Sequence, residues 1–352
     1  MKVRRAHSLV FFWNDNELTA ANYLTSDQVV CDPFLLQVLN KAPEFISIPL
    51  LAKSFGFIPK IKKLINGLVA RNLLLKEGSR EEKTDASLFE NWKWGHDARF
   101  FHFATKEVSY NFNFEEIRKF FEARSLTDPP PSPFKTDTSA PKIRLSRVAD
   151  KPADFWETLY DRRTCREFST RAISKKDLSS FLVPVVGMTR YYNESVLDRR
   201  IIKTSPSGGA RHPVELYIII QNVRSVPRGI YHYQVETNSL CLVNKAVERS
   251  LVIRLFSGQD WVGDAPVSFI FTGVLNRSMW KYDHSRAYKV LLLDTGHLGQ
   301  TFHLVGTALG FGVFTTAAIQ DKLIEKYLKI DGITEIVLYG GCIGHKAIQA
   351  LG

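Results

Sequence analysis

Proline is concentrated in one short stretch of the chain, and this concentration constrains the fold more than any other feature. Six of the 15 prolines in the 352 residues fall between positions 129 and 152. Clustered prolines sustain neither a helix nor a central strand, because each lacks a backbone donor and has a fixed φ. We therefore expect an extended, semi-rigid linker over residues 128–152, which separates a domain of residues 1–127 from a domain of residues 153–352.

The composition is that of a globular protein. Hydrophobic residues make up 45% of the chain and charged residues 24%, which excludes wholesale disorder. No apolar run approaches the roughly 18–20 residues that a membrane span needs. The apolar stretch after the basic N-terminus, residues 9–13, is too short for a signal peptide. We expect a cytoplasmic protein with no membrane segment.

The cysteines and histidines give no sign of a metal or disulfide site. The four cysteines lie far apart and form no C-x-x-C pair, which argues against a zinc ribbon, a redox dithiol or a disulfide framework. No grouping of His, Asp and Glu has metal-ligand spacing, so we expect no metal.

The net charge of +11 suits an anionic partner. A phosphate cofactor, a nucleic acid or an acidic peptide would each be attracted by it. A solvated basic surface would also explain it, because the basic residues are scattered and form no long run. The net charge by itself does not distinguish between these anionic partners and a solvated basic surface.

The first domain has a pattern that is typical of a winged helix. Short apolar helices are expected over residues 34–40, 46–54 and 60–71, followed by a strand at residues 73–76 and a charged turn at residues 77–83. The third helix carries lysines that could meet phosphates, but it lacks the Asn, Gln and Arg side chains that read base edges. A nucleic acid is therefore the less favoured partner, and we expect a peptide-docking domain.

The second domain mixes helices and strands without strict alternation, which predicts an α+β fold. Residues 290–309 form a long helix that is apolar on nearly all sides and should therefore lie at the centre of the domain. Further helices are expected over residues 154–161 and 177–186. Strands are expected over residues 214–220, 229–233, 240–243, 266–273 and 335–340.

Four segments of this domain could carry chemistry. Residues 161–168 hold three arginines and a threonine, and arginine is the bidentate ligand of phosphate. Residues 205–213 form a glycine-rich loop, in which backbone N–H groups could approach a ligand closely. Residues 312–319 and 340–346 offer small residues and donors, and Lys346 could close a phosphate site.

Together these segments resemble the FMN-dependent nitroreductase-like fold. More narrowly they resemble the SagB-type dehydrogenases of ribosomal-peptide maturation, some of which oxidise azolines to azoles. The resemblance covers about residues 155–346. It rests on five motifs in the family order, which read RRTxRxF at 162–168, PSGGARHPxELY at 206–217, GIYHY at 229–233, GQDW with DAP at 258–266, and LLDTGHLGQ leading to ALGFG at 292–312.

The resemblance implies a bound FMN and a set of ligands for it. The arginine-rich motif would hold the phosphate, and the Pro-Ser-Gly loop would lie along the isoalloxazine. The loop after the long helix commonly ends in Gly-Gly-Phe in this family, whereas alanines stand there in this chain, and positive φ is disfavoured for alanine. The implied cofactor residues are Arg162, Arg163, Thr164, Arg166, Pro206, Ser207, Gly208, Thr316, Ala317, Ala318 and Lys346.

Azoline-oxidising members of the family resemble one another in an adjacent Lys-Tyr pair that acts on the substrate. Lys281 and Tyr282 form the literal dipeptide, and Tyr288 and Lys289 form the reversed one. A tyrosine, or a lysine of depressed pKa, could take a proton while the flavin accepts the hydride. We place Lys281 and Tyr282 slightly ahead.

The resemblance implies an FMN-dependent dehydrogenase that oxidises a ribosomally made peptide. The first domain would bind the leader of the precursor peptide, the protein would be a homodimer, and other peptide-modifying enzymes could be partners. Two alternatives stay open. One is an NAD(P)H-dependent reductase of nitro compounds or quinones. The other is a DNA- or peptide-binding protein with a degenerate flavin domain, which the alanines at 317 and 318 favour.

Overall fold

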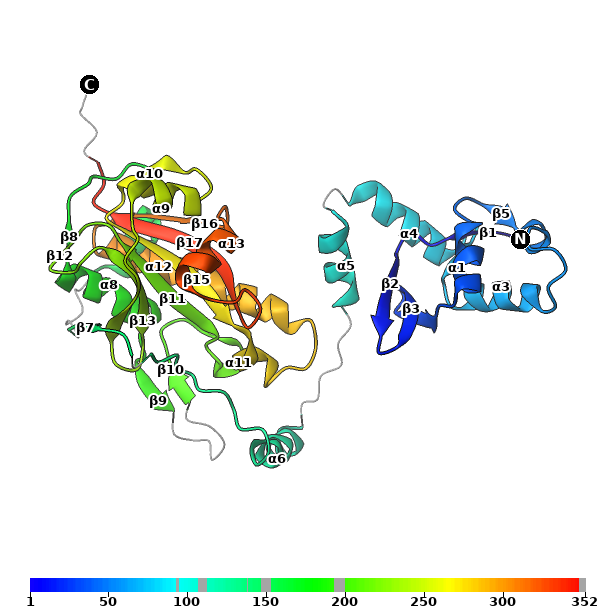
Figure 1. The fold of residues 1–352 in the computed structure, drawn as a ribbon, viewed down its shortest axis with the longest axis horizontal. Helices are drawn as coiled ribbons and strands as arrows, with labels where there is room; N and C mark the ends of the chain where they lie inside the picture. The colour runs from blue at the N-terminus through cyan, green and yellow to red at the C-terminus, as the bar shows by residue number, and fades with distance from the viewer. Residues whose placement is uncertain (93–94, 107–112, 138, 147–152, 193–199, 348–352) are drawn as a thin grey trace, which may run out of the picture. The chain divides into compact units, whose positions relative to one another are not determined.

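The computed structural model describes residues 1–92, 95–106, 113–137, 139–146, 153–192 and 200–347 (Figure 1). The chain divides into two compact units, Met1–Tyr110 and Asn111–Gly352, which we call the N-terminal unit and the C-terminal unit and describe separately. Among the described residues, no helix combines the length and the apolar character that crossing a membrane requires.

The N-terminal unit contains the expected short helices and strand. The helices are α1 (Pro33–Asn40), α2 (Ile48–Lys53) and α3 (Ile61–Ala70), with Asp32 and Ser47 as side-chain caps of the first two. Three strands form an antiparallel sheet in the order β5 (Ile46–Ser47), β1 (Lys2–Arg5), β6 (Leu74–Lys76). This arrangement is compatible with a winged helix. A meander follows β1, made of β2 (Leu9–Asn14), β3 (Glu17–Asn22) and β4 (Asp27–Val30), and the sequence did not predict its last two strands.

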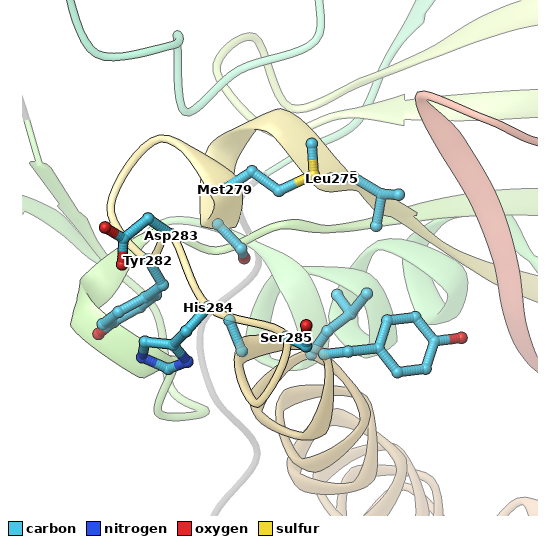
Figure 2. A pocket seen from close by; sticks show the side chains of 10 residues that line it. Leu275, Met279, Tyr282, Asp283, His284 and Ser285 are labelled. Carbon is cyan, nitrogen blue, oxygen red and sulfur yellow. The ribbon is translucent and has the colours of Figure 1, made fainter. Parts of the chain in front are cut away.

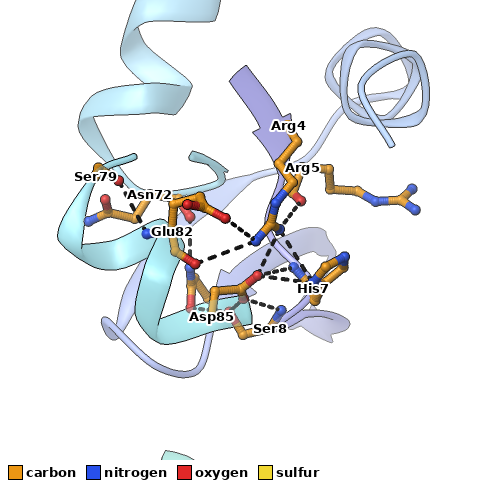
Figure 3. Close-up of polar contacts among 9 residues, drawn as sticks. Arg4, Arg5, His7, Ser8, Asn72, Ser79, Glu82 and Asp85 are labelled. Carbon is orange, nitrogen blue, oxygen red and sulfur yellow. Dashed lines mark hydrogen bonds and ion pairs between the residues drawn. The ribbon is translucent and has the colours of Figure 1, made fainter. Parts of the chain in front are cut away.

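A buried ion pair fixes the next helix, α4 (Arg80–Asn91), to the start of the chain (Figure 3). Arg4 donates to the Asp85 carboxylate at 2.8 Å, and the hydroxyl of Ser8 donates to the same carboxylate at 2.7 Å. Burial alone would raise the pKa of Asp85, but the hydrogen bonds from Ser8 and Arg4 outweigh it and hold that pKa below its usual value. The charged turn expected at residues 77–83 is shorter than predicted, because Ser79 caps α4 there. Helix α5 (His96–Ala104) completes the unit.

The C-terminal unit is built on a seven-stranded antiparallel sheet. Its order is β16 (Gly312–Thr316), β17 (Glu335–Gly344), β15 (Val267–Val274), β11 (Val214–Ile220), β13 (Gly229–Gln234), β14 (Ser239–Asn244), β7 (Lys142–Arg144). The central strand β11 is buried along its whole length, because helices cover both faces of the sheet. The α+β fold predicted from the sequence is confirmed.

Two apolar clusters fill the two faces of this sheet. One lies under α8 (Lys175–Val186) and the long α12 (Ala287–Ala308), where the Phe302 ring packs within 5.0 Å of the rings of Phe181 and Phe269. The other lies under α9 (Arg249–Leu255), α10 (Asp260–Asp264) and α13 (Asp321–Leu328). The long helix thus occupies the central place that its apolar sequence predicts.

The proline-rich segment belongs to the C-terminal unit, and the division between the units precedes it. The Trp280 ring N–H donates to the carbonyl of Asp128 at 2.8 Å, and Arg277 donates to the carbonyl of Ser132 at 3.0 Å. Prolines donate no hydrogen bond, so an extended proline-rich strap presents free carbonyls, and buried donors of the unit take them. Helix α6 (Phe114–Ser125), which precedes the strap, also packs here, with the Phe121 ring 5.2 Å from that of Trp280.

Candidate functional site

The arginine-rich motif follows α7 (Phe155–Asp161) and runs beside the edge strand β16. Thr164 pairs with Val313 of that strand, and the Cys165 N–H donates to the Val313 carbonyl at 2.8 Å. These backbone contacts hold the arginines at the edge of the sheet, next to the C-terminal half of α12.

A cavity of about 440 Å³ opens between this motif, α12 and β16, within the ~300–1,000 Å³ usual for ligand sites. Of the three arginines, Arg162 lines it. Arg163 instead donates to the carbonyl of Tyr160 at 2.7 Å. Arg166 is exposed and lies 5.6 Å from the ring centroid of Phe314. The cavity is lined by Arg162, Leu292, Thr295, Gly296, Gly299, Gln300, His303, Thr315, Leu338 and Tyr339.

His303 gives this cavity an unsatisfied polar group. The side chain is 7% exposed, its Nε2 lies 3.0 Å from the Thr315 hydroxyl, and its buried Nδ1 has no hydrogen-bond partner among the described residues. Burial, and then the charge of Arg162, lower the pKa of His303 to about 4, so the ring is neutral. A guanidinium, an orphaned imidazole nitrogen and a cavity of this size fit a large anionic cofactor such as FMN.

The third and fourth motifs lie along the same edge strand. Thr316 ends β16, and its hydroxyl accepts from the Ala318 N–H at 3.0 Å. Ala317 and Ala318 are exposed, and neither has a positive φ, so both have an ordinary alanine backbone. Lys346 is exposed, and its stem passes Gly312 of β16. The structure therefore brings the first, third and fourth motifs together.

The glycines of the fourth motif do not follow the last strand, as expected, but lie within β17. A Cβ on Gly341 would stand 2.8 Å from the Phe314 carbonyl oxygen, and one on Gly340 would stand 2.7 Å from the Phe256 ring. These glycines permit close packing of the strand, and only the end of the motif is left to contact a ligand.

The Pro-Ser-Gly loop has an unusual backbone. Gly209, Ala210 and His212 have φ values of 62°, 56° and 45°, in a left-handed region that costs non-glycine residues of order 1 kcal/mol or more each. Ser207 holds this conformation, since its carbonyl accepts from the Ala210 N–H and its hydroxyl from the His212 N–H, both at 2.9 Å. Maintained strain of this kind is typical of functional loops.

Asp294 on α12 fixes the start of the loop, a role that we did not assign from the sequence. Its carboxylate accepts from the Ser207 hydroxyl at 2.6 Å and from the Gly208 N–H at 3.0 Å. Burial raises the pKa of Asp294, and the hydrogen bonds from Ser207 and Gly208 oppose that rise. The available signal was a single acid within an otherwise apolar helix, which needs partners when it is buried.

The literal Lys-Tyr pair lies directly over this loop. Lys281 donates to the Gly209 carbonyl at 3.3 Å, and a Cβ added to Gly209 would stand 2.6 Å from both Lys281 Nζ and the Tyr282 hydroxyl. Burial, and then the charge of Asp294, raise the pKa of Tyr282, so its phenol keeps its proton at neutral pH. Tyr288 and Lys289 lie in the first turn of α12, where the Tyr288 side chain is 43% exposed.

A buried charge cluster joins the loop to α11 (Leu275–Met279), the helix before the Lys-Tyr pair. Arg277 forms an ion pair with Glu215 at 2.7 Å and donates to the His212 carbonyl at 3.0 Å, while Arg211 donates to the Arg277 carbonyl at 3.0 Å. Burial would raise the pKa of Glu215, but the charge of Arg277 and the hydrogen bond from His232 lower it to about 2. This cluster fixes the loop and the pair relative to each other.

The two groups of predicted residues lie on opposite sides of α12. Asp294 contacts the Pro-Ser-Gly loop, and His303 faces the arginine-side cavity. Asp294 and His303 are nine residues apart, which is about two and a half helical turns, so their side chains point to opposite faces of the helix. Among the described residues, the arginine cluster and the loop therefore face opposite sides of this helix. Within the described residues, no three His, Cys, Asp or Glu side chains gather as a metal site.

An antiparallel sheet covered on both faces, with a central helix and these motifs at its edge, defines a nitroreductase-like fold. The Nitroreductase family matches residues 159–345, and the chain belongs to this family. A solved structure of a "putative nitroreductase" from Anabaena variabilis superimposes with a TM-score of 0.55 at 21% identity, over 73% of this chain and 49% of that one. That match supports the fold.

Three relatives extend the comparison. "Putative nitroreductase MJ1384" of Methanocaldococcus jannaschii is 29% identical over 49% of this chain and 83% of its own length. The trifolitoxin-processing protein TfxB of Rhizobium leguminosarum is 31% identical over 38% of this chain but only 37% of its own length. The trifolitoxin operon protein TfxC of the same organism is 23% identical over 76% of this chain and 77% of its own length. The resemblance to nitroreductase-like proteins of toxin processing is confirmed.

Proposed function

We propose that this protein is an FMN-dependent dehydrogenase that oxidises a ribosomally made peptide during its maturation. The observation that carries the proposal is the position of Lys281 and Tyr282 over the backbone of Gly209, in the loop that resembles a flavin-binding loop. The similarity to a trifolitoxin-processing protein supports a peptide as the substrate.

The arginine side would hold the cofactor. Arg162, with Thr164, Arg166 and Lys346 on the same edge, would bind the FMN phosphate through charge-assisted hydrogen bonds. Thr316 and Ala317 would offer backbone N–H groups to the flavin ring, and Ala318 would contribute less, because its N–H already donates to the Thr316 hydroxyl. Arg163 would contribute less, because its guanidinium is already bonded to the Tyr160 carbonyl.

Flavin, when bound, supplies a two-electron acceptor for a hydride from a substrate C–H bond. This chain's residues must then remove the accompanying proton. The raised pKa of Tyr282 makes its phenol a hydrogen-bond donor, which would orient the substrate. Lys281 would be the group of the pair that accepts the proton, a role that requires its uncharged amine form and therefore a lysine of depressed pKa. Asp294 would keep the loop in place beneath both side chains.

A homodimer would complete the site. The arginine side and the Pro-Ser-Gly loop lie on opposite sides of α12, so the loop of one copy could meet the cofactor held by another. The exposed surface along α7 and α12 is apolar: Trp156 is 61% exposed, Tyr160 68% and Leu293 61%. Exposed apolar patches of this kind mark protein interfaces.

The N-terminal unit would dock the leader of the precursor peptide. The stretch similar to TfxC covers 76% of this chain, which is more than the C-terminal unit alone, so this similarity reaches into the N-terminal unit. Other peptide-modifying enzymes would share the same precursor. Binding energy from the leader would then hold the reacting residue at the flavin.

The visible spectrum of the purified protein tests the cofactor, and anaerobic mixing with the precursor peptide tests the substrate. The proposal expects a yellow protein whose flavin is bleached by the peptide, with loss of a pair of hydrogens from the peptide by mass spectrometry. The similarity to MJ1384 favours one second candidate, a reductase driven by NAD(P)H. Rapid bleaching by NADPH, with no change in the peptide, would establish that candidate instead.

A further inference from the structure

A second cavity, of about 380 Å³, opens at the turn between α11 and α12 (Figure 2). In this view Leu275 and Met279 lie above the cavity, and Tyr282, Asp283 and His284 lie at its left. Ala287, Tyr288 and Leu291 complete an apolar lining. The cavity is separate from the arginine side, and it shares Tyr282 with the proposed chemistry.

We infer that this cavity binds an aromatic side chain of the substrate peptide, next to the residue that is oxidised. The inference rests on the proposed function and adds to it a rule of substrate selection. Its first support is Tyr282, which both lines the cavity and extends its hydroxyl to Gly209 of the Pro-Ser-Gly loop. A side chain inserted beside Tyr282 would leave its own backbone close to Lys281.

The lining favours an aromatic occupant. Met279 is 58% exposed, although a thioether gains from burial, and Tyr288 is 43% exposed. A methionine adapts to irregular shapes and makes favourable contacts with aromatic rings, and tyrosine rings pack edge to face with them. The carboxylate of Asp283 at the rim would repel an acidic side chain.

The cavity is also fixed in shape before any ligand binds. Helix α11 is anchored by the buried Arg277, which pairs with Glu215 at 2.7 Å and donates to the Ser132 carbonyl at 3.0 Å. Trp280, at the end of α11, donates to the Asp128 carbonyl at 2.8 Å. A preformed pocket selects by shape, because little of the binding energy is spent on ordering it.

The test measures binding of N-acetyl amino-acid amides to the full chain by ligand-observed NMR, without turnover. The phenylalanine amide should bind at least ten-fold more tightly than the alanine and glutamate amides. Met279→Glu should abolish this preference, and Met279→Leu should keep it. Ile333→Glu changes a side chain that is 75% exposed and does not line the cavity, and it should have no effect.

Equal binding of the three amides, or an unchanged preference in Met279→Glu, would overturn the inference. Neither result would touch the proposed function, because binding of an amide needs neither flavin nor oxidation. Conversely, a protein that binds the phenylalanine amide but whose flavin is not bleached by the peptide would keep the pocket and contradict the proposed function.

Discussion

The two sides of α12 differ in how far the protein itself satisfies the polar groups of the site. On the loop side, Asp294 binds Ser207 and Gly208, and Lys281 donates to Gly209. On the arginine side, Arg162 lines an open cavity, and the buried Nδ1 of His303 has no partner in the part of the chain that the structure describes. The loop side is paired before any ligand arrives, and the arginine side is not.

This difference indicates different tasks. Side chains whose partners are already in place are held in one geometry, which is what proton transfer and orientation of a substrate require. Charges and donors without partners gain them from a ligand, and the gain is large when the ligand is an anion. We therefore propose that the loop side carries the chemistry and that the arginine side binds the cofactor.

The largest effect is expected from the Lys-Tyr pair. Lys281→Ala should lower turnover of the peptide by about 10²- to 10⁴-fold, because a positioned general base contributes that much. Tyr282→Phe should lower turnover less, because the Tyr282 phenol would orient the substrate and not take the proton. FMN should stay bound, since its phosphate would be held on the arginine side, away from both side chains. Stopped-flow reduction of the flavin by the peptide measures the loss. Tyr288→Phe and Lys289→Ala test the alternative pair in the same way, and parental rates in both members of the first pair would contradict the assignment.

Removing Arg277 should affect stability most. Arg277→Ala leaves Glu215 buried without its cation, and breaking a buried ion pair costs about 3–5 kcal/mol of unfolding free energy. The exposed pair of Arg249 with Asp264 provides the control, because solvent screens it. Urea unfolding of both variants measures the difference. Equal midpoints for Arg277→Ala and Arg249→Ala would show that the loop side does not depend on this cluster.

Lowering the pH should reduce the stability of the folded protein, because His303 becomes protonated. Its pKa is lowered from 6.5 to about 4 in the folded state, so the unfolded chain binds more protons between these values. The stability that the neutral ring contributes is therefore complete above pH 6.5 and is lost as the pH falls toward 4. The loss is at most about 3 kcal/mol. Unfolding midpoints measured across this range should fall less steeply in His303→Phe than in the parent.

The loss of FMN affinity on replacing each arginine should depend on whether that arginine already has a hydrogen-bond partner. Arg162→Ala should weaken FMN binding by about 1.5–3 kcal/mol, the usual contribution of a hydrogen bond to a charged group. Arg163→Ala should weaken it less, because Arg163 is already bonded to the carbonyl of Tyr160. Flavin titration of the two apoproteins measures both effects, and the Arg163→Ala Arg166→Ala double variant tests the remaining charge. Stronger loss in Arg163→Ala than in Arg162→Ala would reverse this assignment.

Sequence patterns predicted most of the C-terminal unit because its elements have strong local signals. Residues 214–220 are apolar except for Glu215, and the structure has β11 over the same residues. The role of Asp294 needed the structure, because nothing local says which loop a helical carboxylate will meet. The proline-rich strap shows the same limit. Its extended form follows from proline, whereas its attachment to Arg277 and Trp280 depends on residues far away in the chain.

The smallest effect concerns the strain in the Pro-Ser-Gly loop. Ala210 has a φ of 56°, which costs an alanine about 1 kcal/mol but costs glycine almost nothing. Glycine also makes the unfolded chain more flexible, which offsets roughly 0.5–1 kcal/mol of that gain. Ala210→Gly should therefore change the free energy of unfolding by less than about 1 kcal/mol.

The neighbouring Gly209→Ala keeps the positive φ but adds a Cβ that would stand 2.6 Å from Lys281 Nζ and from the Tyr282 hydroxyl. That variant should be clearly less stable and should displace the pair, with a fall in turnover. Thermal unfolding and peptide oxidation, measured on both variants, distinguish strain that only shapes the loop from packing that positions the chemistry. If Gly209→Ala behaves like Ala210→Gly, the close contact between the loop and the Lys-Tyr pair is not needed for stability or turnover. The loop side would then not depend on a fixed geometry more than the arginine side does.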